Sequence, residues 1–414
     1  MHTNPAGAVL TIGAIERSSS FLTGNAFIQN LQPSDYLVQI ARKGYQPWTK
    51  TIHVEPQTVT ELYPILMPIT PVTTVLKTAS STLIQSSPES SLLIFHQTAK
   101  KMHTYEVFDT NLNRSIPFAD TLSQNSMASI PDDAEWHWTN ESHALIDTPS
   151  NWYTLEHNNG GIRVRSLYLN TALQNALAKK PRFMAAHPAH PSHYFLLDDT
   201  NFVRWNPESH SMEQLLQSIG GIAVGDSHLI LWDLQSGMPH RTTLDATQAQ
   251  PYASTSLPLI TSDTLQELNN NLLVTDKYGI WLLPNTGKQP IQLTNNPQMY
   301  HTTHTDAYVL WWNAKSISMY WIVPELQLPS FQKTHLETIY ASGGTIQQVL
   351  PYPNEHYLLM QEDNTIYAFE LDGRGGTRNK HLLYKGENPV FHAPPHEKII
   401  YVYDDGTLFT IDLP

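Results

Sequence analysis

The chain is 414 residues long, carries 24 Lys and Arg against 37 Asp and Glu for a formal net charge of −13, and contains no cysteine. The missing cysteines exclude disulfides, Cys-ligated metal centres and thiol catalysis, and the acidic balance disfavours nucleic acid or an anionic membrane surface as a partner. With 40% hydrophobic but only 15% charged residues, the chain can bury a sizeable core, and its length suits two or three domains.

The chain starts without a recognisable targeting segment. No apolar run reaches the roughly 18 residues that a membrane-spanning helix needs, and no signal peptide precedes the first strand pattern. Met1 leads almost directly into that pattern, so we expect residue 1 to be a truncated start rather than the natural one.

The first part of the chain has the pattern of a small β-domain. Short runs of β-forming residues occupy positions 8–12, 36–41, 49–54 and 58–66, and Gly, Pro or Asn bounds them. This pattern predicts an all-β sandwich over residues 1–68.

Three motifs in this region resemble the PEGA domain family. Residues 4–8 are Asn-Pro-Ala-Gly-Ala, with Ala where the family has Glu, and residues 31–36 are Leu-Gln-Pro-Ser-Asp-Tyr, with Ser where Gly is usual. Residues 43–48 match the closing motif as Lys-Gly-Tyr-Gln-Pro-Trp, whereas residues 13–24 lack the expected Asp-Gly hairpin. The resemblance covers residues 2–67 and implies a non-catalytic surface module of bacterial envelope proteins.

Tyr45 and Trp48 are open to two interpretations. As exposed rings they could stack on a sugar, and as buried rings they would cap the small core. We predict that both belong to the core, because a domain of this size needs large side chains to bury enough surface.

A segment punctuated by Pro64, Pro68 and Pro71 follows. Proline stiffens a linker, so we place the boundary of a second domain here, at residues 69–414, and expect the two domains to fold separately. Limited proteolysis should then cut between residues 62 and 72.

The remainder of the chain repeats. A polar turn leads into a short apolar strand eight times, and the first strand residues are spaced by 35 to 52 positions. Those residues are Leu92, Ala144, Tyr194, Leu229, Leu272, Tyr308, Tyr357 and Ile399. Periods in this range are typical of propeller blades.

Most copies continue into a second strand, although the fourth copy is irregular. These strands lie at residues 104–109, 152–157, 202–206, 278–283, 318–323, 365–371 and 407–413. Two central strands with a weaker strand on each side make a four-stranded blade. We therefore predict an all-β chain with a propeller of seven or eight blades. Eight is favoured, and seven would follow if copy four or five were an insertion.

The turn-and-strand pattern resembles the repeats of TolB-like and WD40-like propellers, and this resemblance implies architecture alone. Sustained helical periodicity is missing from the sequence of the repeats. Residues 171–180 and 212–218 are the two candidates for short helices.

The last copy ends at residues 407–413 and has no outer strand after it. Because an open strand edge promotes aggregation, we predict that residues 71–77 pair with residues 407–413 as the closing strand, with Val75 and Leu76 buried. A chain that starts at residue 69 would then remain stable. A chain that starts at residue 79 would melt earlier or aggregate.

Three histidine clusters could bind a metal ion. They are His187, His190 and His193; His301, His304 and Asp306; and His392, His396 and Glu397. Imidazole and carboxylate groups suit zinc, but each cluster occupies the turn before an apolar strand, which other copies fill with Ser, Pro, Asn or Glu. We therefore expect polar turns, with no metal and no cofactor.

The segment Gly225-Asp226-Ser227 resembles the opening of one class of hydrolase. That class carries the motif near the start of an α/β fold, whereas here it lies in the fourth β repeat. A nucleophilic Ser also needs a positioned base. We predict no catalytic residue, and a Ser227→Ala variant without effect on stability or turnover.

A possible calcium loop consists of alternating oxygen-bearing residues, namely Asp109, Asn111, Asn113 and Ser115, together with Asp120. Oxygen ligands at alternate positions suit Ca²⁺. However, Arg114 occupies the position where a sharp turn favours Gly, so we predict an ordinary loop.

Several tryptophans could line a glycan groove, namely Trp136, Trp138, Trp311, Trp312 and Trp321. Propellers also use aromatic residues as packing between blades. We predict the packing role.

Together, the repeats and the resemblance predict a non-catalytic binding or scaffold protein of the bacterial cell envelope. It would lie outside the cytoplasm, anchored to the membrane by a segment beyond this chain, and its propeller would present a face to a protein or cell-wall glycan. The alternative is a propeller-based hydrolase or lyase acting on envelope glycans or peptides. The binding residues themselves are not predicted.

Overall fold

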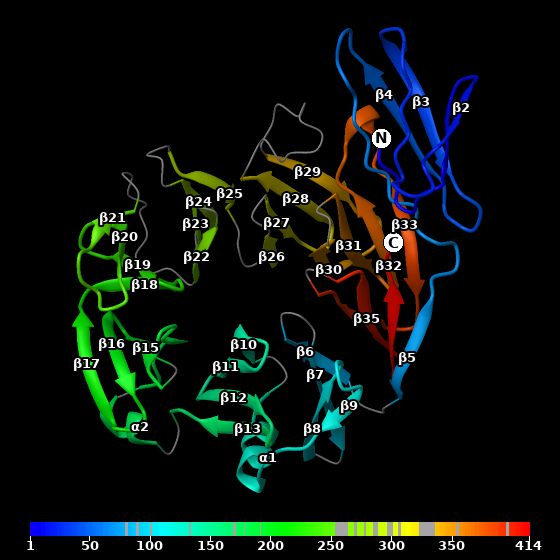
Figure 1. Cartoon of the computed structure of the whole chain (residues 1–414). Coiled ribbons are helices and arrows are strands. Elements are labelled where there is room, and N and C mark those ends of the chain that lie inside the picture. Colours follow the sequence, from blue (N-terminus) through cyan, green and yellow to red (C-terminus); the bar gives the residue numbers. More distant parts are fainter. Residues whose placement is uncertain are drawn as a thin grey trace. The chain divides into compact units, whose positions relative to one another are not determined.

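The structure is a computed structural model of the chain. It describes residues 1–78, 82–87, 91–99, 102–131, 134–168, 171–177, 179–190, 192–252, 264–268, 271–276, 279–284, 289–295, 301–304, 308–322, 336–352, 356–394 and 397–414. This part is all-β and holds nine four-stranded antiparallel sheets (Figure 1). The chain divides into two compact units, one made of Met1–Ser80 with His301–Pro414 and the other of Ser81–Tyr300.

The N-terminal module, residues 1–68, is built on one sheet with the strand order β2-β1-β3-β4. Its strands are β1 (Val9–Ile12), β2 (Ile15–Ser18), β3 (Ser34–Ala41) and β4 (Trp48–Val54). Three of the four predicted runs are therefore strands. The fourth, at residues 58–66, is not a strand, since only Ile65 pairs there, in a single bridge to Asn4. Pro64 has no N–H to donate to a ladder, which disfavours a strand at this point.

Strand β2 lies in the segment 13–24, which lacks the Asp-Gly hairpin motif expected from the resemblance. Gly13 and Ala14 form the turn between β1 and β2, and Gly13 has a φ of 56°. Gly adopts positive φ at little cost, so Gly13 allows a tight turn without the Asp-Gly pair.

The core of the N-terminal module follows the alternation of its strands. Leu10, Val38, Ile40 and Trp48 are buried together, and Tyr45 packs against them. Trp48 is only 1% exposed. The prediction that Tyr45 and Trp48 belong to the core is confirmed.

Three further four-stranded antiparallel sheets belong to the same unit as the N-terminal module; two are meanders of consecutive strands, and the third adds β5 to three consecutive strands. The first contains β26 (His301–His304), β27 (Tyr308–Trp312), β28 (Ser316–Trp321) and β29 (Leu336–Ala341). The second contains β30 (Ile346–Pro351), β31 (Tyr357–Glu362), β32 (Thr365–Glu370) and β33 (Lys380–Lys385). The third contains β34 (Val390–His392), β35 (Ile399–Asp404), β36 (Thr407–Asp412) and β5 (Thr73–Thr78).

The pairing of β5 with β36 joins the start of the repeat region to its end. The register sets Ile411 opposite Thr73 and Phe409 opposite Val75, so the predicted strand pairing is present. The prediction that Val75 and Leu76 are buried is only partly confirmed, because Leu76 is half-buried but Val75 is 62% exposed. As the outermost strand of its sheet, β5 is exposed along Thr73, Thr74 and Val75.

The second unit holds five sheets of the same meander type. They contain β6 (Thr82–Ser86), β7 (Leu92–Ala99), β8 (Met102–Asp109) and β9 (Arg114–Ile116); β10 (Glu135–Asn140), β11 (His143–Asp147), β12 (Trp152–Asn158) and β13 (Gly161–Ser166); β14 (Phe183–Ala186), β15 (Tyr194–Asp198), β16 (Asn201–Asn206) and β17 (Ser211–Leu216); β18 (Ile219–Val224), β19 (His228–Asp233), β20 (Met238–Thr243) and β21 (Gln250–Pro251); and β22 (Thr264–Leu268), β23 (Asn271–Asp276), β24 (Gly279–Pro284) and β25 (Ile291–Thr294).

The eight apolar runs found in the sequence are the second strands of these eight sheets. Each begins at the predicted residue or one residue before it. These strands could be recognised in the sequence because they are buried on both faces, as in β27, where all five residues are buried. A strand enclosed on both sides is a continuous apolar run, which is the clearest strand signal in a sequence. The β-propeller class of fold is thereby confirmed.

Other elements differ from the prediction. The fourth copy is regular, since β19 continues into β20, and residues 212–218 contribute to strand β17 rather than to a helix. The helix α2 (Ala172–Ala176) lies in its predicted segment. The helix α1 (Thr121–Ala128) was not predicted, because it has little apolar periodicity and begins only through the Asp120 cap. None of the described helices has the length and apolarity to cross a membrane.

Candidate functional site

The N-terminal module is joined to the β30–β33 sheet by a buried ion pair. The Lys50 side chain is completely buried, and its Nζ lies 2.9 Å from Glu370 Oε2 and 3.5 Å from Asp372 Oδ1. Trp48 Nε1 donates a hydrogen bond of 3.0 Å to the other Glu370 oxygen. Strands β4 and β32, far apart in sequence, therefore share one compensated charge cluster.

Further contacts surround this ion pair. The Asn379 side chain accepts from Thr49 N and donates to Thr49 O, so it caps the edge of β4 as another strand would. Gly375, in the short helix η3 (Arg374–Gly376), approaches Thr51 O so closely that a Cβ would lie 2.2 Å from it. Arg374 holds the Asp372 carboxylate and donates to Glu61 O. Backbone and side-chain contacts thus fix the N-terminal module against this sheet.

A small cavity beside the ion pair holds His356. It measures about 20 Å³, and Tyr63 stacks on the His356 ring with centroids 4.8 Å apart. Burial lowers the pKa of His356 to about 4, although Asp372 opposes the shift. The cavity has room for a water molecule but not for an organic ligand.

The N-terminal module contains a much larger cavity of about 680 Å³. Apolar residues of the sheet, among them Leu10, Val38 and Ile52, line it together with the two segments 26–31 and 54–60. Within those segments Phe27 is 63% exposed and Val59 is 70% exposed. The segment at residues 58–66 that did not form a strand is thus part of a wall around an accessible apolar cavity.

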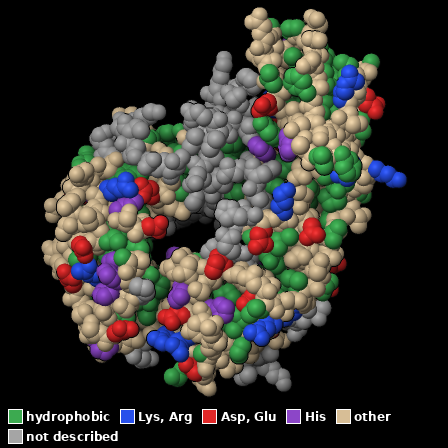
Figure 2. Space-filling view, in the orientation of Figure 1, with side chains coloured by type: hydrophobic (Ala, Val, Ile, Leu, Met, Phe, Trp, Pro, Cys, Tyr) green, Lys and Arg blue, Asp and Glu red, His purple; other side chains and the backbone are tan. Residues whose placement is uncertain are grey.

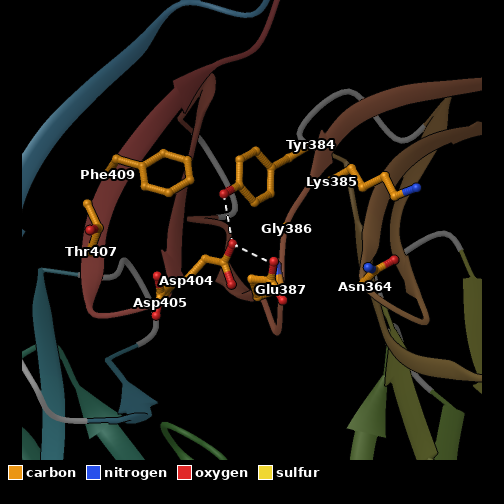
Figure 3. A pocket seen from close by; sticks show the side chains of 9 residues that line it. All are labelled: Asn364, Tyr384, Lys385, Gly386, Glu387, Asp404, Asp405, Thr407 and Phe409. Atoms are coloured by element: carbon orange, nitrogen blue, oxygen red, sulfur yellow. Dashed lines mark hydrogen bonds between the residues drawn. The ribbon is translucent and has the colours of Figure 1, made fainter.

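A second hollow, open and of about 670 Å³, lies between β33 and β36 (Figure 3). The Asp404 carboxylate at its centre accepts hydrogen bonds from Tyr384 Oη at 2.8 Å, Glu387 N at 3.1 Å and Asn388 N at 2.8 Å. Burial, and then the bond to Asp404, raises the pKa of Tyr384 to about 12. Asp404 serves to connect two neighbouring sheets.

A carboxylate at the end of a second strand recurs in other sheets. Glu362, which ends β31, accepts from Tyr340 of β29 and from Lys380 of β33. Burial raises the pKa of Glu362, but the hydrogen bonds from Lys380, Ser342 and Tyr340 outweigh burial and lower it to about 2. This position of the repeat thus contributes a contact between sheets.

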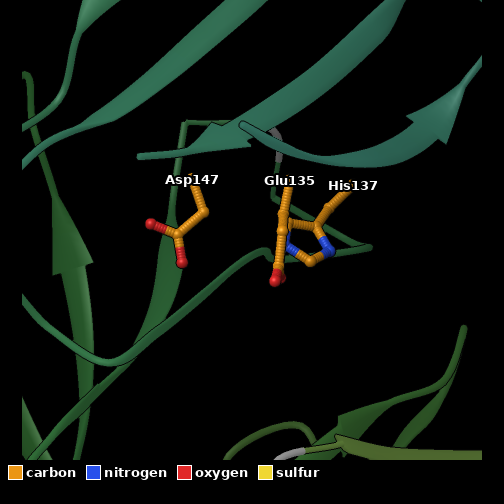
Figure 4. Close-up of side chains that lie close together, drawn as sticks. All are labelled: Glu135, His137 and Asp147. Carbon is orange, nitrogen blue, oxygen red and sulfur yellow. The ribbon is translucent and has the colours of Figure 1, made fainter. Parts of the chain in front are cut away.

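Asp147 ends β11 at the same position, and there Glu135 and His137 lie beside it (Figure 4). One potential ligand atom of each of the three residues lies within 4.8 Å of the others. Lys180 Nζ forms an ion pair with Asp147 Oδ1. Burial raises the pKa of Asp147 more than Lys180 lowers it, and burial lowers the pKa of His137.

Sequence reasoning missed this cluster, although its signal was present. Glu135 and His137 alternate on one strand and therefore share a face, and the pairing of β10 with β11 sets Glu135 directly opposite Asp147. The buried Lys50 was missed as well, since a Lys in an alternating run is ordinarily expected to face solvent.

The predicted histidine clusters have different outcomes. His187, His190 and His193 do come together, with ring centroids 4.8 to 6.3 Å apart. Burial, and then His190, lowers the pKa of His187. Ala189 N donates to His187 Nδ1, which occupies one of the two ring nitrogens that could bind a metal.

The remaining two clusters fall partly outside the described residues. The members that lie outside the described residues are Asp306, His396 and the side chains of His301 and His304. In the third cluster, burial lowers the pKa of His392 to about 4, and Glu397 is exposed.

The Gly-Asp-Ser segment does not assemble a hydrolase site around its neighbouring histidine. His228 Nε2 lies 2.6 Å from Glu267 Oε2, and Arg241 donates to His228 Nδ1 at 3.1 Å. Both ring nitrogens therefore face other partners, and Ser227 is exposed. His228 cannot act as the base for Ser227 in this arrangement.

The possible calcium residues are used locally. Asp109 Oδ1 accepts from Leu112 N at 2.9 Å, and Asp120 Oδ1 accepts from Ser123 N at 2.6 Å as the cap of α1. Arg114 and Ser115 belong to strand β9. The five predicted residues are thus divided among a turn, a strand and a helix cap.

The tryptophans take part in packing. Trp311, Trp312 and Trp321 are 3%, 6% and 1% exposed, respectively. Trp136 and Trp138 stack with centroids 6.1 Å apart against the apolar core of their unit. The packing role is confirmed.

On the face shown in Figure 2, basic side chains lie among acidic ones.

No family model matches the chain, and no curated protein matches it. Similar solved structures include a chain of a mitotic checkpoint complex (11% identity, 67% of this chain and 86% of that one, TM-score 0.40) and the AfRom2 CNH domain (12%, 66% and 91%, TM-score 0.33). Another is Hsv2 from Kluyveromyces lactis (11%, 54% and 69%, TM-score 0.33).

Proposed function

We propose that this chain is a non-catalytic binding protein of the bacterial cell envelope, held outside the cytoplasm by a membrane anchor in the full-length protein. Its partner is a protein that inserts apolar side chains into the cavity of the N-terminal module. The cavity of about 680 Å³, with apolar walls and exposed Phe27 and Val59 beside it, is the observation that carries this proposal.

The walls of the cavity favour apolar contacts. Phe27 and Val59 of its lining offer exposed hydrocarbon surface, and burying such surface drives most protein association. A titratable pair like those of hydrolases is missing from its described lining, which contains Glu55 as its one carboxylate side chain. Binding suits this lining better than acid–base chemistry, which needs two groups with different tasks.

The second support is the fixed position of the N-terminal module on the β30–β33 sheet. The Lys50–Glu370 ion pair and the Asn379 contacts with β4 hold the module in one orientation. A preorganised site loses less entropy on binding. The module and this sheet would therefore present one rigid surface to the partner.

Site-specific photo-crosslinking in intact cells tests the proposal. A photoreactive residue at position 27 of the full-length protein should give a discrete protein adduct, and one at position 72 should not. Val72 is a matched control, because it is 61% exposed but lies outside the cavity. A Val59→Asp substitution should remove the adduct at position 27, since a charge in an apolar site opposes binding.

Protease added to intact cells, with and without permeabilisation of the outer surface, tests the location. The full-length protein should be cleaved before the cytoplasmic membrane is breached. Adducts of equal strength at positions 27 and 72 would contradict the binding site, and protection until the cytoplasm is opened would contradict the envelope location.

A further inference from the structure

We propose that Glu135, His137 and Asp147 form a binding site for a zinc-like divalent cation on the β10–β11 hairpin. This goes beyond the proposed function, since it concerns a different unit of the chain and a different ligand. The three side chains offer one imidazole nitrogen and two carboxylate oxygens.

The β-sheet sets the positions of the three ligands. Glu135 and Asp147 are directly paired across β10 and β11, and His137 is two residues further along the same face. Figure 4 shows the three side chains on one side of this strand pair. Directly opposite residues of antiparallel strands have Cβ atoms about 5 Å apart, which suits a shared ligand.

The distances are close to those of a bound ion. Ligand atoms about 2.1 Å from a tetrahedral zinc are separated by about 3.4 Å. His137 Nε2 lies 4.0 Å from Glu135 Oε2, and each potential ligand atom lies within 4.8 Å of the others. The Glu135 side chain is 79% exposed, so it can move by the remaining distance without disturbing the core. Three protein ligands would leave a fourth position for water.

Lys180 acts as the outer partner of the site. Its Nζ bonds Asp147 Oδ1 and also donates to Thr148 O at 2.7 Å, which leaves Asp147 Oδ2 available to the ion. Carboxylates that bind a metal are ordinarily held by such a second contact. Two carboxylates and one ammonium leave the cluster with net negative charge, which attracts a cation.

The ligand types select the class of cation. An imidazole with two carboxylates suits zinc and its neighbours among the first-row metals, whereas calcium takes six to eight oxygen ligands. Zinc and cobalt should therefore bind here, and calcium and magnesium should not compete.

The experiment uses the full chain after treatment with a chelator. Cobalt is titrated as a spectroscopic probe, and zinc is titrated by calorimetry, because a chain with 20 histidines will also bind metal elsewhere. Glu135→Gln and His137→Gln should each weaken the tightest site at least about tenfold and reduce its cobalt absorption. Both side chains are partly or largely exposed, so the metal-free melting temperature should stay unchanged.

His143→Gln is the matched control. His143 is an exposed residue of β11, on the same hairpin, and it contacts Asn140 and Ser142 rather than the cluster. This variant should change the affinity by less than about twofold. The proposal is overturned if His137→Gln and His143→Gln behave alike, or if excess calcium displaces cobalt from the tightest site.

Discussion

Lys50 is a charged residue in a place where charge is costly. Its ammonium is fully buried between β4 and β32, and Glu370 and Asp372 compensate it. Desolvating ions costs several kcal/mol each, so the arrangement is stable only while all partners are present. We expect Lys50→Met to lower the free energy of unfolding by about 3–5 kcal/mol, because it leaves buried carboxylates uncompensated. Urea denaturation followed by fluorescence measures this loss.

Lys179→Met is the control for that substitution. Lys179 lies 3.5 Å from Asp199, and both side chains are mostly exposed. An exposed ion pair contributes about 0–1 kcal/mol. The free energy of unfolding of the Lys179→Met variant should therefore stay near that of the unmodified protein. Losses of similar size in both variants would show that burial of the Lys50 pair is unimportant.

His381 makes the protein sensitive to mild acid. It is 4% exposed, and burial lowers its pKa to about 4. In the unfolded chain a His titrates near pH 6.5. The unfolded state therefore binds more protons between about pH 6.5 and 4, and stability falls as the pH falls through this window.

A His381→Phe variant should lose part of this dependence on pH. Free energies of unfolding measured from pH 7 to pH 4 should fall less steeply than in the unmodified chain. His143→Phe, at an exposed position, should follow the unmodified chain. An unchanged slope in His381→Phe would mean that other groups cause the acid sensitivity.

Sequence reasoning recognised the aromatic core residues but not the charged ones. Trp48 was predicted to be buried on its size, and Lys50 and Ile52 share its face of β4. The burial of Lys50 depends on Glu370 and Asp372, which lie more than three hundred residues away along the chain. A local pattern holds no information on such a partner.

Among the elements, the turn after β33 is held closed by Asp404. A Cβ added to Gly386 would lie 1.9 Å from Asp404 Oδ2, which is closer than atoms can approach. We expect Gly386→Ala to displace Asp404 from its donors and to cost about 1–3 kcal/mol of stability. Gly343→Ala is the control, since a Cβ there meets nothing within 4 Å. Its free energy of unfolding should stay within about 1 kcal/mol of that of the unmodified chain. Equal unfolding midpoints for the two variants would contradict this role of Asp404.

Strand β5 is the second element whose contribution can be measured. Chains that start at residues 64, 69 and 79 should melt at successively lower temperatures. The first step removes Ile65 and Met67, which are buried against the β30–β33 and β34–β36 sheets and contribute about 1.5–3 kcal/mol each. The second step removes the ladder with β36, at about 1 kcal/mol for each hydrogen bond.

This series refines the expectation that a start at residue 69 is harmless. The buried positions of Ile65 and Met67 were not visible in a Pro-rich segment. Equal melting temperatures for the starts at 69 and 79 would show that β5 contributes nothing to stability.

The second strand of each sheet was predictable and the fourth strand, apart from β5, was not, for a physical reason. The second strand of each sheet is buried on both faces, as β31 is almost throughout. The fourth strand is more exposed, and β17, with four exposed residues, lacks the apolar run that marks a strand. Its polar sequence was therefore interpreted as a helix.

For the whole molecule, the structure changes where the chain should be cut. Residues 65–67 of the connector are buried, whereas Ile69 is 64% exposed and Val72 is 61% exposed. Limited proteolysis should therefore cleave at residues 69–72 and spare residues 62–68, because proteases need an accessible and locally unfolded backbone. Mass spectrometry of the first fragments identifies the site. Early cleavage before Met67 would contradict the burial of this segment.

The candidate sites depend on contacts between residues that are far apart in the sequence, and such contacts could not be predicted from local patterns. The sequence located the turns that carry the histidine clusters, yet the contacts of His228 depend on Glu267 and Arg241, which lie on other strands. The apolar cavity is formed by residues 26–31 and 54–60 together. Residues 26–31 have no strand or helix pattern of their own, and the strand pattern over residues 58–66 predicted a further strand rather than a wall.

The pairing of β5 with β36 has a consequence for synthesis. The ribosome makes β5 before any of the repeats, and it makes the partner strand β36 after the second strand of every one of the eight repeat sheets. During translation β5 leaves the ribosome with no strand of its own sheet yet available, and it must stay soluble until β36 emerges. Within Thr73–Thr78, Lys77 favours solubility at this stage, since a charged side chain on a free strand reduces pairing with other chains. The sheet of β34, β35, β36 and β5 is thus incomplete in any nascent chain that stalls before β36.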